Sequence, residues 1–200
     1  MKIASLMQVL AGGGVAIAPT ETVYGLCARA DKPAAISRLY VLKGRGGDKP
    51  LALCVAGLPM ARLYGTFSPL AGQLAEAFWP GPLTLVVPAV NPRALDKRLY
   101  NGATIALRCP DIDWAKSLTA PLALTSANRA GAPDSLTATA AKAALGAVDA
   151  ILEDDEAINP RAKPSTIIAI QGGNRARILR AGALGAKNFA AFNIDWSADA

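Results

Sequence analysis

The 200-residue sequence contains no histidine, and this absence restricts its chemistry more than any other feature. Imidazole is the side chain that usually moves protons near neutral pH, so Ser-His-Asp triads and histidine metal sites are excluded. Catalysis by this chain has to rest on lysine, arginine, carboxylates, hydroxyls, a bound ion or groups of the substrate itself.

Cysteines and aromatic residues are also scarce. The three cysteines, Cys27, Cys54 and Cys109, are an odd number, lie far apart and form no CxxC pair. This spacing argues against a disulfide framework or a zinc site and predicts buried, reduced thiols. Aromatic residues make up only 6% of the chain, which disfavours a platform that stacks the bases of single-stranded RNA.

Long apolar runs are missing as well, since no stretch approaches the roughly 18–20 residues that a membrane span needs. Three glycines, residues 12–14, interrupt the apolar N-terminal stretch, which favours a helix, a glycine stop and a strand over a signal peptide. We therefore expect a cytoplasmic protein that does not contact a membrane. Neither GxxxxGK[ST] nor a GxGxxG between strand and helix is present, so any nucleotide is held by other elements.

The residues that are present fit one compact, basic domain. Hydrophobic residues make up 52% of the chain and charged residues 18%. The 21 lysines and arginines exceed the 15 aspartates and glutamates, which gives a net charge of +6. Such a surplus attracts nucleotides, phosphates or nucleic acid, although it is also typical of an ordinary solvated surface.

Helical and strand-like periodicities alternate along the chain. Helices are predicted at residues 5–13, 33–43, 69–79, 112–118 and 137–146. Strands are predicted at residues 14–19, 50–56, 81–89, 103–110, 121–126, 147–153, 165–170 and 176–182. The late strands follow one another without helices, so we expect a single α/β domain over residues 1–184 with a mixed sheet and flanking helices. The tail, residues 185–200, either packs on this domain or covers a cavity mouth.

Polar side chains gather where several predicted strands end, which is where α/β sheets bind ligands. "PTETVYGL", residues 19–26, is either an elaborate turn or a segment whose hydroxyls face a ligand. "KGRGGDKPL", residues 43–51, is a phosphate-binding loop or a solvated basic loop. Ser126 and Asn128 are separated by one residue, so their side chains point the same way if the chain leaves the strand in an extended conformation. They then either orient oxygens of a ligand or form a local turn.

Two arginines and a further hydroxyl pair follow the same pattern. Arg108 and Arg180 each end an apolar strand, and a buried cation is costly unless it meets an anion. That anion is a ligand or an internal Asp or Glu. Ser165 and Thr166 lie where a predicted strand begins, and their hydroxyls either contact a ligand or are ordinary strand residues without a ligand.

Seven motifs, taken in order, resemble those of the YrdC/TsaC family of threonylcarbamoyl-AMP synthases. They are "PTETVYGL", "KGR…KPL", "WPGPLTLV", "IALRCP", "TSANRAG", "PSTII" and "ILRAG". The resemblance runs from Gly14 to Gly182. It implies a twisted mixed α/β sheet with a concave basic cavity. It also implies a nucleotidyltransferase that makes threonylcarbamoyl-AMP and pyrophosphate from L-threonine, bicarbonate and ATP. Downstream tRNA threonylcarbamoyltransferase proteins would then modify adenosine 37 of tRNA.

The same resemblance implies a role for individual residues. Lys43 and Arg45 would act on the transferring phosphoryl group, and Mg²⁺ would arrive with ATP, without a metal site on the protein. The implied threonine-binding residues are Thr22, Arg108, Ser126, Ser165 and Cys54, and the implied ATP-binding residues are Arg45, Lys49, Thr104, Asn128 and Arg180. Cys54 stands where many members have histidine, which predicts weaker contacts with threonine. Gly46 stands where many members have proline, which predicts a looser loop.

Rival interpretations keep the cavity and change its use. One is binding of double-stranded RNA or tRNA, as an additional or sole role. Another is a carbamoyl-transfer domain like that of hydrogenase maturation factors, although the zinc motifs of those proteins are missing. The third is a paralogue of the same fold that only interacts with partners.

Overall fold

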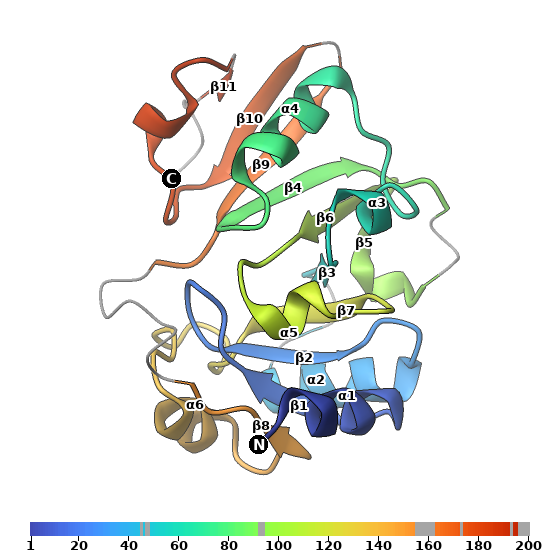
Figure 1. The fold of residues 1–200 in the computed structure, drawn as a ribbon, viewed down its shortest axis with the longest axis vertical. Helices are drawn as coiled ribbons and strands as arrows, with labels where there is room; N and C mark the ends of the chain where they lie inside the picture. Colours follow the sequence, from blue (N-terminus) through green and yellow to red (C-terminus); the bar gives the residue numbers. More distant parts are fainter. Residues whose placement is uncertain are drawn as a thin grey trace.

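One mixed β-sheet runs through the whole molecule (Figure 1). The computed structural model describes residues 1–44, 46, 49–91, 95–154, 163–172, 174–192 and 194–195. Within these residues the 11 strands follow the order β11-β10-β9-β4-β6-β3-β7-β2-β1-β8, with β5 paired to β6. The strands are β1 (Val15–Ala18), β2 (Gly25–Arg29), β3 (Ala52–Cys54), β4 (Leu83–Pro88), β5 (Tyr100–Asn101), β6 (Thr104–Arg108), β7 (Leu122–Ser126), β8 (Ala150–Ile151), β9 (Thr166–Gln171), β10 (Arg175–Arg180) and β11 (Ile194–Asp195).

The sheet contains both parallel and antiparallel pairs, which confirms the predicted mixed α/β fold. The pairs β1/β8, β3/β6, β4/β9 and β10/β11 are parallel. The pairs β1/β2, β2/β7, β3/β7, β4/β6, β5/β6 and β9/β10 are antiparallel. Segments that are distant in sequence therefore become neighbours, and β9 lies directly beside β4.

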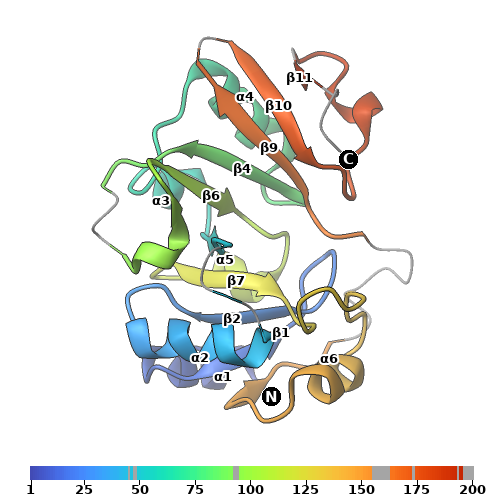
Figure 2. The same ribbon diagram turned by 180° about the vertical axis from the view of Figure 1, so that it is seen from behind.

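Helices cover different parts of the two sheet faces. They are α1 (Ile3–Ala11), α2 (Pro33–Lys43), α3 (Leu58–Ala61), α4 (Pro69–Phe78), α5 (Asp113–Lys116), α6 (Ala138–Leu145) and the 3₁₀ helices η1 (Lys97–Leu99) and η3 (Ala186–Phe189). Helices α1 and α2 lie on opposite sides of β1 and β2, while α4 packs against β4 on the face turned to the viewer in Figure 1. The reverse view shows β4, β6 and β9 with no helix in front of them (Figure 2). None of the described helices combines the length and the apolar character that crossing a membrane requires.

Local signals in the sequence explain where the longer helices start and stop. Pro33 occupies the first turn of α2, and Gly44 ends this helix in the left-handed conformation, with φ of 59°. Ser68 caps α4, because its hydroxyl accepts a hydrogen bond from the Ala71 N–H at 3.3 Å. Thr137 caps α6 in the same way. The helix predicted at residues 33–43 is therefore confirmed at both ends.

Strands β4 and β6 divide their side chains between the core and the open face. In β6, Ile105 and Leu107 are buried in the main hydrophobic cluster, which also contains residues of α4. Ala106 and Arg108 point to the other side and line a cavity. Because side chains alternate along a strand, each of these strands supplies both packing and polar groups.

Helix α3 and the strands β2, β5 and β11 were not predicted from the sequence. Strand β2 follows "PTETVY" directly and was not predicted, because its five residues carry no polar alternation and four of them are fully buried. The described part of the tail joins the domain, since β11 pairs with β10 and Phe189 packs on Phe78 with ring centroids 4.7 Å apart. Of the two placements considered for the tail, the structure thus shows packing on the domain for residues 186–192.

Candidate active site

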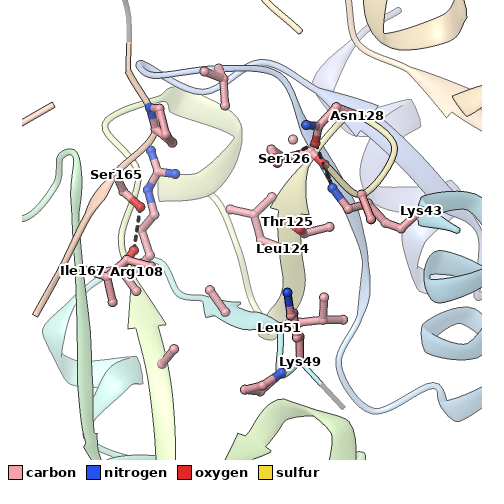
Figure 3. Close-up of a pocket in the computed structure, with 18 of the residues that line it drawn as sticks. Lys43, Lys49, Leu51, Arg108, Leu124, Thr125, Ser126, Asn128, Ser165 and Ile167 are labelled. Carbon is pink, nitrogen blue, oxygen red and sulfur yellow. Dashed lines mark hydrogen bonds between the residues drawn. The ribbon is translucent and has the colours of Figure 1, made fainter. Parts of the chain in front are cut away.

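A cavity of about 580 Å³ opens on the helix-free face beside β4, β6 and β9. Figure 3 shows Arg108 and Ser165 on one side of it, and Lys43, Ser126 and Asn128 on the other. Seven residues with a predicted site role contribute to its lining: Lys43, Lys49, Arg108, Ser126, Asn128, Ser165 and Arg180. Strands β6, β7 and β10, the end of α2 and neighbouring loop positions thus bring cations and hydroxyls to a single space.

The turn between β1 and β2 is organised around Thr20. Its hydroxyl donates to the Val23 carbonyl at 2.7 Å, lies 2.8 Å from the Thr22 hydroxyl and accepts from the Thr22 and Val23 N–H groups, each at 3.2 Å. Both threonines are almost fully buried, and of the two only Thr20 belongs to the cavity lining. The segment is therefore an elaborate turn beside the cavity, and contact of its hydroxyls with a ligand stays a prediction.

Arg108 lies at the end of β6 and is held from one side. Its Nη2 donates to Thr22 Oγ1 at 2.7 Å and to Glu21 Oε1 at 2.9 Å. Its Nε is buried and has no hydrogen-bond partner in the described part of the chain. The internal anion left open by the sequence is thus Glu21, although the buried Nε of this guanidinium lacks an acceptor among the described residues, which is costly.

Ser165 connects three strands at the same side of the cavity. Its hydroxyl lies 2.8 Å from Thr84 Oγ1 in β4, and Arg180 Nη2 donates to it at 3.2 Å. The Arg180 guanidinium also donates to the Ser165 carbonyl through Nε and Nη2. Burial lowers the pKa of Arg180 below its ordinary value, and Asp134 opposes this shift. The Arg180 guanidinium therefore holds both the carbonyl and the hydroxyl of Ser165.

Lys43 forms the cationic centre of the opposite side. Its Nζ donates to Asn128 Oδ1 and to the Ser126 carbonyl, both at 2.8 Å, and the residue is 4% exposed. The Ser126 hydroxyl also donates to Asn128 Oδ1, at 2.7 Å. Ser126 and Asn128 do face the same way, as their spacing predicts, and they form a local network that fixes the lysine.

The far end of the basic loop is anchored through Tyr40. The Tyr40 hydroxyl donates to the Lys49 carbonyl at 2.9 Å, which places Lys49 at the cavity. Gly44 and Gly46 line the cavity too. Arg45, to which both a catalytic and an ATP-binding role were assigned, lies outside the described residues.

Besides Thr22, two predicted site residues do not line the cavity. Thr104 begins β6 on the same strand face as Ala106 and Arg108, and its hydroxyl donates to the Asn101 carbonyl at 2.9 Å. Cys54 ends β3, is fully buried and lies opposite Arg108 in the strand register. Their implied contacts with ATP and threonine stay predictions.

All three cysteines are free and buried, as predicted from their spacing. Burial raises the pKa of Cys27 to about 12, that of Cys109 to about 11 and that of Cys54 well above its ordinary value of 9.0. Arg108 opposes the shift at Cys54, but burial outweighs it. These thiols are protonated at neutral pH.

Sequence reasoning missed several residues of the site. Thr20, Thr84 and Arg129 line the cavity, and Glu21 pairs with Arg108, although none had been assigned a role. The threonines stand in quoted motifs, so their position beside strand ends was a usable signal. No signal in the sequence places Glu21 against Arg108, because the contact joins residues 87 positions apart.

Comparisons with known proteins agree with the motif order. Residues 8–182 match the Sua5/YciO/YrdC family profile, which is described as "Telomere recombination". A threonylcarbamoyl-AMP synthase of Chromohalobacter salexigens is 36% identical over 182 residues, which are 88% of this chain and 96% of that protein. A threonylcarbamoyl-AMP synthase of Bacillus subtilis is 39% identical over 138 residues, which are 66% of this chain and 40% of that protein.

The fold also matches a solved structure. The crystal structure of P. abyssi Sua5 complexed with L-threonine superposes with a TM-score of 0.84 at 30% sequence identity, over 96% of this chain and 58% of that chain. This chain therefore spans less than two thirds of the length of the Bacillus and Pyrococcus proteins. The matches confirm the fold and the resemblance predicted from the motifs.

Proposed function

This chain belongs to the Sua5/YciO/YrdC family, and on that premise we propose that it is an L-threonylcarbamoyladenylate synthase. The proposed reaction converts L-threonine, bicarbonate and ATP into threonylcarbamoyl-AMP and pyrophosphate. The names of the Chromohalobacter and Bacillus relatives support this activity, and the L-threonine bound to P. abyssi Sua5 supports the amino-acid substrate.

The observation that carries the proposal is the buried cation Arg108, which lines the cavity and makes hydrogen bonds to the described residues only through Nη2. A substrate carboxylate in the cavity would accept from the remaining part of this guanidinium, and a charge-assisted hydrogen bond of this kind is stronger than a neutral one. The hydroxyls of Ser165 and Thr20 lie at the same cavity and suit the remaining polar groups of a small amino acid.

The opposite side suits the nucleotide. Lys43 is held rigidly at the cavity, so it would neutralise charge on the transferring phosphoryl group without reorganising. Lys49 supplies further positive charge at the lining, and Arg180 supplies it from beside Ser165. In this proposal Mg²⁺ enters with ATP, since magnesium commonly keeps phosphate oxygens and water as ligands.

The chemistry requires alignment more than proton transfer. The uncharged threonine amine attacks carbon dioxide derived from bicarbonate and forms a C–N bond, and the amine proton passes to solvent. An oxygen of the resulting carbamate then attacks the α-phosphorus, and the bond to the β-phosphate breaks, so that pyrophosphate leaves. Holding both substrates in one cavity removes most of the entropic cost of this encounter.

The direct test is to incubate the protein with radiolabelled bicarbonate, L-threonine and ATP, and to measure labelled threonylcarbamoyl-AMP together with pyrophosphate. We expect product that depends on all three substrates. ATP cleavage without threonine, or ATP and threonine titrations without binding, would contradict the proposal and favour a paralogue that only interacts with partners. Transfer to adenosine 37 of tRNA by downstream proteins, binding of RNA and a cytoplasmic location stay predictions.

A further inference from the structure

The carboxylate of Glu21 connects two different parts of the site. Its Oε1 accepts a hydrogen bond from Arg108 Nη2 at 2.9 Å. Its Oε2 accepts from the backbone N–H of Asp111 at 3.2 Å, just beyond the strand that carries Arg108. Both oxygens are therefore used, and the carboxylate cannot rotate without losing one of these contacts.

Fixing Nη2 fixes the whole guanidinium, because this group is planar and its five N–H donors have a rigid arrangement. Thr22 Oγ1 accepts from the same nitrogen at 2.7 Å, so two oxygens define its direction. The rest of the guanidinium then keeps one orientation as well, and within the described part of the chain Arg108 makes hydrogen bonds only through Nη2.

The pairing also solves an electrostatic problem. The Arg108 side chain is only 8% exposed, and its ion pair with Glu21 is the one found for it among the described residues. Without this carboxylate, the empty site would contain a buried and uncompensated cation, which is strongly unfavourable. Glu21 itself does not belong to the cavity lining, so it would act through Arg108 and not on the substrate.

We propose that Glu21 is a positioning residue that holds Arg108 ready to receive the carboxylate of the amino-acid substrate. This inference rests on the proposed function, because it assigns the acceptor of Arg108 to threonine. Its consequence is selectivity for a carboxylate, since a pre-oriented arginine forms the new bond without the cost of ordering its side chain.

The test measures binding of three probes by calorimetry: L-threonine, L-threoninol, which lacks the carboxylate, and ATP. The variants are Glu21→Gln and Glu21→Ala. Asp31→Asn is the matched control, because it breaks another Arg–carboxylate pair, Arg29–Asp31, outside the cavity lining. We expect both Glu21 variants to bind L-threonine about 10-fold or more weakly, the usual effect of losing a hydrogen bond to a charged group. Binding of threoninol and ATP should change less than about 2-fold, and the control should bind all three probes like the wild type.

Equal losses for threonine and threoninol would indicate a general structural role and overturn the inference, as would unchanged threonine binding in both variants. Weaker ATP binding in both variants would overturn it too. If the wild type makes no threonylcarbamoyl-AMP but the preference for threonine over threoninol still collapses in the variants, the proposed function is wrong and the positioning role of Glu21 stands.

Discussion

Replacement of Lys43 by methionine tests the proposed chemistry most directly. Methionine keeps an unbranched chain of similar length, so the change removes mainly the charge and the donors. In the structure, Nζ donates to two acceptors at 2.8 Å and is almost fully buried. Loss of one preorganised electrostatic stabiliser raises the barrier by roughly 3–4 kcal/mol, so turnover should fall about 100- to 1000-fold.

In free-energy terms, stability should change somewhat less than the activation barrier in this variant. The Ser126 carbonyl loses its lysine donor, whereas Asn128 Oδ1 keeps the hydrogen bond from Ser126 Oγ. One buried acceptor left unpaired costs about 1–3 kcal/mol of unfolding free energy. The assay is production of labelled threonylcarbamoyl-AMP, accompanied by urea unfolding, and Lys142→Met on the exposed side of α6 is the control. A folded Lys43→Met protein with more than about a tenth of the wild-type turnover would refute the reasoning, since it would leave less than about 1.4 kcal/mol for this lysine.

Three other predictions follow from the same structure. Arg108→Lys should raise the KM for threonine by about 10-fold or more and leave the KM for ATP within about 2-fold, because lysine lacks the planar fork; equal changes in both KM values would contradict this. Thiol titration of the native protein at pH 8 should detect no reactive cysteine, and urea should release all three. In the folded protein the pKa of Cys27 is raised from 9.0 to about 12. Its contribution to the free energy of unfolding is therefore present below pH 9 and declines as the pH rises from 9 to 12. Unfolding curves measured across this pH range would reveal the decline. Phe189→Ala should lower the unfolding free energy by about 3–5 kcal/mol, because it removes a buried ring that packs on α4; a loss under about 1 kcal/mol would show that this segment contributes little.

The sequence predicts those parts of the fold that depend on local signals. Helix α2 begins at Pro33 and ends before Gly44 because a fixed φ and a left-handed residue act within one turn. Strand β2 escaped prediction, because its burial comes from β1 and β7 on its two edges and helices on its faces. The two-residue strands β5 and β11 exist only through their pairing with distant segments.

The candidate site shows the same division. The types of residue at strand ends predict a polar, basic cavity, and seven of the expected residues line it. The sequence leaves open whether Arg108 meets a ligand or an internal carboxylate, and only the three-dimensional contacts show that Glu21 takes one nitrogen and leaves another without a partner. Pair contacts across 87 residues depend on the strand order, which no local pattern encodes.

The two-sided use of β4 and β6 limits how this cavity can change. A single inserted or deleted residue in either strand would reverse its faces, turning leucines such as Leu85 and Leu107 toward the substrates and the polar residues Thr84 and Arg108 toward α4. Exchange of one side chain for another has no such effect. New substrate preferences in this chain can therefore arise by substitution along these strands, while their lengths have to stay constant.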